Sequence, residues 1–125
     1  FYMEKKDEKY LMEVKGCTLE IDSIGYFPDA PSERAVRHLH ELMHAVKQGY
    51  HCILAFVIAM PGVTVVRPNM TTHPAFGQAL SEAMAAGVEV WYLPCEITAD
   101  SIQIKGRKRK YYSVQDRLYP HVVIQ

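Results

Sequence analysis

The segment His51–Met60 constrains the fold most, because every residue after the histidine is apolar. Its β-branched and aromatic residues favour a strand, and an apolar side chain at each position predicts burial on both faces. Strands of this kind are typical of parallel sheets that helices cover in α/β domains. The apolar run Cys52–Met60 is far shorter than the ~20 residues of a membrane helix. We therefore expect a central sheet strand and no membrane partner.

The segments on either side of this strand carry a helical pattern. Glu33–Gln48 is predicted to be a helix that Asp29 or Ser32 caps and Gly49 ends. A second helix is predicted over His73–Ala86. Apolar residues recur every three or four positions in both, as on one buried helix face. These residues are Val36, Leu39, Met43 and Val46 in the first helix, and Phe76, Leu80 and Met84 in the second.

Shorter β-favouring segments surround this alternation of helices and strands. Phe1–Met3 and Tyr10–Thr18 form a predicted hairpin. Ile21–Phe27 either extends the second of these strands or is a separate short strand, and Glu96–Lys105 is predicted as a weak hairpin. The expected segments are Phe1–Met3, Tyr10–Thr18, Ile21–Phe27, Val63–Arg67, Val88–Leu93 and Glu96–Lys105. The order predicts an α/β fold with a mixed central sheet flanked by helices.

Composition limits the class of protein. The 125 residues fit one globular domain, with 49% hydrophobic and 22% charged residues. Lys and Arg number 14, as do Asp and Glu, so the net charge does not indicate a nucleic-acid partner. The three cysteines, Cys17, Cys52 and Cys95, are too few and too widely spaced for a disulfide framework or a zinc site. Reduced thiols in a cytoplasmic protein are expected.

An acid and an amine lie two positions apart in the strand predicted over Tyr10–Thr18. Glu13 and Lys15 therefore share one face of that strand, with Val14 on the other. Metal-assisted phosphodiester cleavage needs oxygen ligands and a positive group near the developing charge. If the chain folds back after the following Pro-rich turn, Glu33 returns to this face. The alternative is a Glu13–Lys15 ion pair that binds no ligand.

Several separated motifs along the chain occur in the order and spacing of a known family. They are Glu13-Val14-Lys15, Thr18-Leu19, Phe27-Pro28-Asp29-Ala30-Pro31, Glu33-Arg34, His38-Leu39, Glu41-Leu42, Leu54-Ala55-Phe56-Val57-Ile58, Arg67-Pro68-Asn69, Pro74-Ala75-Phe76 and Ala86-Gly87-Val88-Glu89-Val90. By these motifs, residues 1–104 resemble the sugar fermentation stimulation protein A family. The resemblance implies a DNA-binding protein. It also implies a C-terminal domain with the restriction-endonuclease-like core of the PD-(D/E)xK nucleases, preceded by an OB-like domain.

The resemblance assigns roles to residues of this chain. Glu13 would be the metal-binding acid, Lys15 the lysine of the motif and Glu33 the accessory acid, while Val14 would offer its carbonyl to the metal. The implied metal is Mg²⁺ or Mn²⁺. In the family, the leading acid of the nuclease motif comes just before the position of Phe1. We therefore expect a truncated domain without that acid or the OB-like domain, and with weak metal and DNA binding.

Basic residues are predicted to contact double-stranded DNA. Arg34 and Arg37 lie one helical turn apart and could meet phosphates or pair with Glu33 and Glu41. A basic run followed by two tyrosines suits backbone and base contacts, although a solvated hairpin end is equally expected. Its predicted contact residues are Lys108, Arg109 and Lys110.

Two histidines one helical turn apart, His40 and His44, could hold a metal, although the sequence shows no third ligand and solvated histidines are favoured.

The motifs and the resemblance together predict a nuclease-like domain over residues 1–105, followed by a basic extension over residues 106–125. The domain would bind DNA and act as a Mg²⁺- or Mn²⁺-dependent endo- or exodeoxyribonuclease.

Two other functions stay open. The first is a non-catalytic DNA-binding regulator of sugar (maltose) metabolism with a vestigial site. The second is a protein-interaction module with no nucleic-acid role. A homodimer also stays open.

Overall fold

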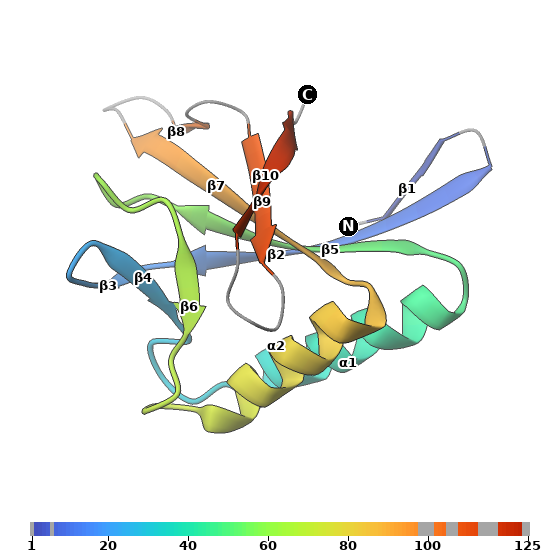
Figure 1. Cartoon of the computed structure of the whole chain (residues 1–125), viewed down its shortest axis with the longest axis horizontal. Helices are drawn as coiled ribbons and strands as arrows, with labels where there is room; N and C mark the ends of the chain where they lie inside the picture. Colours follow the sequence, from blue (N-terminus) through green and yellow to red (C-terminus); the bar gives the residue numbers. More distant parts are fainter. Residues whose placement is uncertain (1, 6, 98–101, 105–107, 113–117, 124–125) are drawn as a thin grey trace.

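The computed structural model describes residues 2–5, 7–97, 102–104, 108–112 and 118–123 (Figure 1). The helices are α1 (Glu33–Lys47) and α2 (Pro74–Ala86). The strands are β1 (Tyr2–Lys5), β2 (Glu8–Cys17), β3 (Leu19–Ile21), β4 (Ile24–Phe27), β5 (His51–Ile58), β6 (Val66–Pro68), β7 (Glu89–Ile97), β8 (Ile102–Ile104), β9 (Lys108–Tyr112) and β10 (Leu118–Val123). In this part of the chain, neither helix is long and apolar enough to cross a membrane.

The main sheet has the order β1-β2-β5-β7-β8. β2, β5 and β7 run parallel, whereas β1 and β8 are antiparallel to their neighbours. The predicted mixed central sheet is thereby confirmed. The register between β2 and β5 joins Glu13 to Leu54 and Lys15 to Phe56, so the predicted acid and lysine lie beside the most buried strand.

The strand β5 is buried on both faces, as predicted. Leu54, Phe56 and Ile58 belong to the main core beneath the helices. Ile53 and Ala55 face the opposite side, where they pack with Leu93 in a smaller cluster. This two-sided burial explains why the segment carries no polar residue after His51.

Both helices cover the same face of the sheet (Figure 1). They pack against each other, and α1 also contacts β2 and β5. We expected helices flanking the sheet, and in the structure both helices lie on one face of it. The strand order explains the difference, because the chain moves in one direction from β2 to β5 to β7. Crossovers are almost always right-handed, and two that move in the same direction place their helices on the same face.

The predicted first helix is confirmed, and its N-cap is Ser32 rather than Asp29. Ser32 Oγ accepts a hydrogen bond from the N–H of Ala35 at 3.1 Å. Beyond the cap residue Gln48, Gly49 has a φ of +95°, the left-handed conformation that commonly ends helices. The predicted stripe was right at Leu39 and otherwise wrong, because Val36, Met43 and Val46 are only partly buried. The buried residues of α1 are Ala35, Leu39, Leu42 and Ala45.

The second helix begins at Pro74, after the cap residue His73, and ends before Gly87, whose φ is +112°. Phe76 and Leu80 are buried as predicted, whereas Met84 is only partly buried. The remaining buried positions of α2 are also small: Gly77, Ala79 and Ala83. Small residues on both helices allow the close packing of α1 against α2.

A second, smaller sheet has the order β3-β4-β6. Ile21–Phe27, predicted as an extension or a short strand, forms part of the β3–β4 hairpin, which turns at Asp22 and Ser23 with positive φ at both. Asn69, just after β6, braces the end of β4, because its backbone N–H donates to the Phe27 carbonyl and its side-chain amide donates to the Pro28 carbonyl. The start of α1 is held separately, by the N–H of its cap residue Ser32, which donates to His73 Nδ1 at 3.0 Å.

The C-terminal strands form two antiparallel pairs. β7 pairs with β8, as the predicted hairpin requires, although the predicted tip at Ala99–Ser101 lies outside the described residues. β9 pairs with β10, and β9 also lies against β7. The predicted basic extension therefore contains two paired strands within its described part.

Candidate metal and nucleic-acid site

Alternate residues of β2 face opposite sides of the sheet. Leu11 and Cys17 pack in the main core beneath the helices, so Glu13 and Lys15, at the same parity, lie on the helix-covered face. Val14 lies on the other face, where it is 49% exposed. The shared face of the acid and the lysine is confirmed, but the strand is more open around Val14 than its apolar neighbours suggested.

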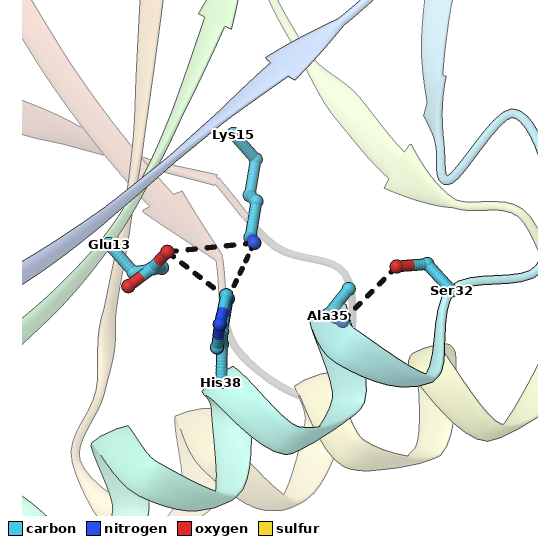
Figure 2. Close-up of polar contacts among 5 residues, drawn as sticks. All are labelled: Glu13, Lys15, Ser32, Ala35 and His38. Carbon is cyan, nitrogen blue, oxygen red and sulfur yellow. Dashed lines mark hydrogen bonds and ion pairs between the residues drawn. The ribbon is translucent and has the colours of Figure 1, made fainter.

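Three side chains form a triangle between β2 and α1 (Figure 2). Lys15 Nζ lies 3.6 Å from Glu13 Oε1. His38 reaches from α1 between them, with its Nδ1 at 2.7 Å from Lys15 Nζ and 3.1 Å from Glu13 Oε1. The side chains of Lys15 and His38 are each 14% exposed, whereas Glu13 is 32% exposed. The carboxylate is therefore the part of the triangle that solvent reaches most easily.

The structure does not bring Glu33 into this triangle. Glu33 is exposed at the first turn of α1, and within the described residues no hydrogen bond or ion pair joins it to Glu13 or Lys15. His38, just over one turn further along the same helix, occupies the place expected for it. The role of Glu33 as an accessory acid stays a prediction.

His38 carried no predicted role, although its position in the sequence gives a usable signal. It lies three residues after Ala35 and four before Leu42, at the edge of the buried stripe of α1. A polar residue at the margin of a buried helix face meets the neighbouring sheet rather than bulk solvent. The position of His38 gives this signal only when Ala35 and Leu42 are placed on the buried face of α1, whereas the prediction placed Val36 and Met43 there.

The edge of β2 next to Glu13 is only partly covered. Among the described residues, β1 pairs with β2 over Glu8–Leu11 and no further. The backbone of β2 beyond Leu11 therefore lacks a described partner strand on that side. The predicted use of the Val14 carbonyl as a metal ligand stays a prediction.

The two predicted phosphate contacts, Arg34 and Arg37, are exposed on α1. Neither forms an ion pair with Glu33 or Glu41 in the part of the chain that the structure describes. The alternative, in which these arginines pair with acids of their own helix, is thus not seen in the described residues. Lys108, Arg109 and Lys110 belong to β9, and their predicted DNA contacts stay predictions.

The remaining candidate ligands do not assemble. His40 and His44 are both exposed, which agrees with solvated helix histidines. Across the described residues, no group of three His, Cys, Asp or Glu side chains could hold a metal. The three cysteines are free thiols, as predicted. Burial raises the pKa of the Cys17 thiol, which donates to the Leu19 and Tyr26 carbonyls.

Comparison with known proteins identifies the family. The sequence model described as "Sugar fermentation stimulation protein RE domain" matches residues 1–101. A sugar fermentation stimulation protein homolog of Desulfitobacterium hafniense strain Y51 is 48% identical over 103 residues, covering 82% of this chain and 45% of the relative. The Clostridium beijerinckii homolog is 46% identical over 105 residues, covering 84% of this chain and 46% of the relative.

A solved structure agrees. Pyrococcus furiosus SfsA in complex with Ca²⁺ is 28% identical, with a TM-score of 0.77 over 84% of this chain and 46% of that chain. The mixed α/β architecture is therefore the nuclease-like fold of that protein. The chain spans slightly less than half the length of each of these three proteins. It belongs to the sugar fermentation stimulation protein family, within the region of the RE domain.

Proposed function

We propose that this domain binds DNA and hydrolyses phosphodiester bonds with Mg²⁺ or Mn²⁺ held at Glu13. One observation carries the proposal: Lys15 Nζ lies 3.6 Å from Glu13 Oε1 on the helix-covered face of β2. An acid that can bind a metal thus lies beside an amine that can stabilise negative charge, in the strand where the nuclease motif needs them. Pyrococcus furiosus SfsA was solved in complex with Ca²⁺, which supports binding of a divalent metal by a relative of this chain.

The residues present fit a metal that keeps most of its water. Glu13 offers one carboxylate that is 32% exposed, and Val14 would add its carbonyl. Mg²⁺ is commonly bound by one or two carboxylates while it retains several waters. When bound, such a metal polarises the phosphate and lowers the pKa of a bound water. The ammonium of Lys15 would then stabilise the charge that develops on the phosphate oxygens.

The register of β1 and β2 supports a second carboxylate beside Glu13. Tyr2 pairs with Leu11 and Met3 with Tyr10, so each step towards the N-terminus on β1 moves one residue further along β2. If this register continued, a residue placed directly before Phe1 would lie opposite Glu13. Cross-strand partners have Cβ atoms about 4.5–5.5 Å apart, which allows two carboxylates to share one metal. The leading acid of the family comes at this position.

DNA would approach over the exposed start of α1, next to the triangle. Arg34 and Arg37 are exposed there and have no ion-pair partner in the described residues. Each phosphate that they neutralise would release counterions and make binding sensitive to salt. The charge of the whole chain is balanced, so binding would depend on these local residues.

Metal binding tests the site first. Two versions of the chain would carry the same short leader before Phe1, ending in Asp or in Asn, and calorimetry would measure the Kd for Mn²⁺. We expect the Asp version to bind at least about tenfold more tightly, because a second carboxylate joins Glu13. Glu13→Gln should abolish this advantage. Equal affinity of the two versions would show that the register argument is wrong.

Cleavage tests the chemistry. Supercoiled plasmid would be incubated with the Asp-leader chain and Mg²⁺ or Mn²⁺, comparing Lys15→Met with Lys47→Met. Lys47 is an exposed lysine in the last turn of α1 and serves as the matched control. We expect metal-dependent nicking that Lys15→Met removes and Lys47→Met retains. Nicking that survives chelation, or equal activity of the two variants, would contradict the proposal.

A second function is favoured by a different observation. Glu13 already contacts both Lys15 and His38, and no group of three candidate ligands exists in the described residues. A non-catalytic DNA-binding regulator with a vestigial site fits such a satisfied triangle. Salt-sensitive DNA binding without cleavage by any metal would select this function over the nuclease.

A further inference from the structure

The closest partner of Lys15 is on the helix and not on its own strand. Its Nζ lies 2.7 Å from His38 Nδ1 but 3.6 Å from Glu13 Oε1 (Figure 2). The longer distance allows electrostatic attraction but no good hydrogen bond, whereas the shorter one is a tight hydrogen bond. The orientation of the ammonium is therefore set mainly by His38.

The chemistry of the imidazole decides which atom donates. Nδ1 offers either a lone pair or a proton, and an ammonium has three donors and no acceptor. If Nδ1 accepts from the Lys15 ammonium, 2.7 Å away, a neutral His38 ring carries its proton on Nε2. In that arrangement Nδ1 and Glu13 Oε1, which lie 3.1 Å apart, are both acceptors, and the Lys15 ammonium attracts both of them.

We infer that His38 is a positioning residue, whose Nδ1 accepts a hydrogen bond from Lys15 and holds the ammonium beside Glu13. This inference rests on the proposed function for its catalytic meaning. A divalent cation on Glu13 would repel the ammonium and weaken its attraction to the carboxylate. Mg²⁺ prefers oxygen ligands to imidazole, so the contact with His38 would be weakened less and would keep Lys15 in place.

The helix provides a firm base for this role. His38 lies between Ala35 and Leu42 along α1, and both are buried in the main core. Ser32 caps the helix less than two turns earlier. A positioning group on a packed, capped helix holds its partner more precisely than a group on a loop.

The ring tautomer tests the contact directly in the wild-type chain. Long-range ¹H–¹⁵N correlation spectra of the metal-free protein, at about pH 8 where ordinary imidazoles are neutral, report which nitrogen carries the proton. We expect His38 to be protonated at Nε2 and unprotonated at Nδ1. A proton on Nδ1 would mean that His38 donates to Glu13 instead, and the inference would be wrong. Lys15→Met should release this tautomer preference.

Kinetics test the positioning role. In the Asp-leader chain, His38→Leu should lower kcat for plasmid nicking about 10- to 100-fold, as the loss of an orienting partner does in metal sites. The KM for DNA should stay unchanged. His38→Asn should recover most of the activity, since its amide oxygen can accept near the position of Nδ1. His40→Leu, an exposed histidine of the same helix, is the control. Equal activity of His38→Leu and His40→Leu would overturn the inference.

The two proposals fail in different ways. An Asp-leader chain that cleaves no DNA in any metal refutes the nuclease, while the tautomer of His38 still decides whether Lys15 is held. Active protein with Nδ1 protonated refutes the positioning role alone. If His38→Leu does not fold, as judged by circular dichroism, the tautomer and the His38→Asn variant decide the matter.

Discussion

The N-cap of α1 allows a quantitative prediction about the element that supports the site. Ser32→Ala removes the hydroxyl that accepts the Ala35 N–H at 3.1 Å. Ala35 is only 1% exposed, so water cannot easily replace the lost acceptor. Removing such a cap costs about 0.5–2 kcal/mol in general, and the burial of this donor places the expected loss near 1–2 kcal/mol.

This loss converts to a shift in melting temperature. Unfolding entropy is about 2.1 cal/mol/K per residue, so a chain of this length loses roughly 4 °C of Tm for each 1 kcal/mol. Ser32→Ala should therefore lower the Tm by about 4–8 °C. It should also lower the urea midpoint without changing the m-value, because the surface exposed on unfolding stays the same.

The assay is urea unfolding followed by circular dichroism, with Ser81→Ala as the control. Ser81 is exposed inside α2, where alanine has the higher helix propensity, so this change should stabilise the chain by a few tenths of a kcal/mol. Ser32→Thr should retain most of the cap. If Ser32→Ala and Ser81→Ala shift the midpoint equally, the cap does not stabilise α1 and the reasoning fails.

Three further predictions concern packing, ionisation and charge. Gly25→Ala should cost about 1–3 kcal/mol by urea unfolding, because its Cβ would lie 2.9 Å from Cys17 Sγ, whereas Gly16→Ala, with no atom within 4 Å, should be nearly neutral. Burial raises the pKa of Cys17, so the native state keeps a proton that the unfolded chain loses above about pH 8.5. The free energy of unfolding should then fall as pH rises beyond that value, and it should fall less in Cys17→Ala; equal slopes would contradict this. The double variant of Arg34 and Arg37 to Gln should reduce the slope of log K for DNA against log salt by about 2, and an unchanged slope would exclude both from the interface.

The sequence predicted the central part of the fold well, because burial there is two-sided or strictly periodic. His51–Met60 could be assigned to a central strand since all its positions are apolar after the first. The helices were located by their spacing and by Gly49 and Gly87 at their ends. Leu39 was placed correctly in the buried stripe of α1, but the rest of the stripe was shifted by one position, because Ala35 and Ala45 carry little hydrophobic signal although they are buried.

The site was predicted in part. Glu13 and Lys15 share a face because strand geometry alone requires it. Glu33 did not reach them, since the position of a side chain on a helix depends on how that helix is rotated over the sheet. That rotation is set by the small buried residues of α1, and it turns His38 toward the strand while leaving Glu33 exposed.

The connection from β2 to β5 has a consequence for folding. Glu13 and Lys15 come from β2, and His38 comes from the helix inside this connection, whose closure pairs Tyr10 with the distant His51. Such non-local pairing is slow, because loop-closure entropy must be overcome before the contacts form. The docking of α1 on β2 that closes this loop also forms the triangle. A collapsed chain that has not closed it contains the right residues but no site.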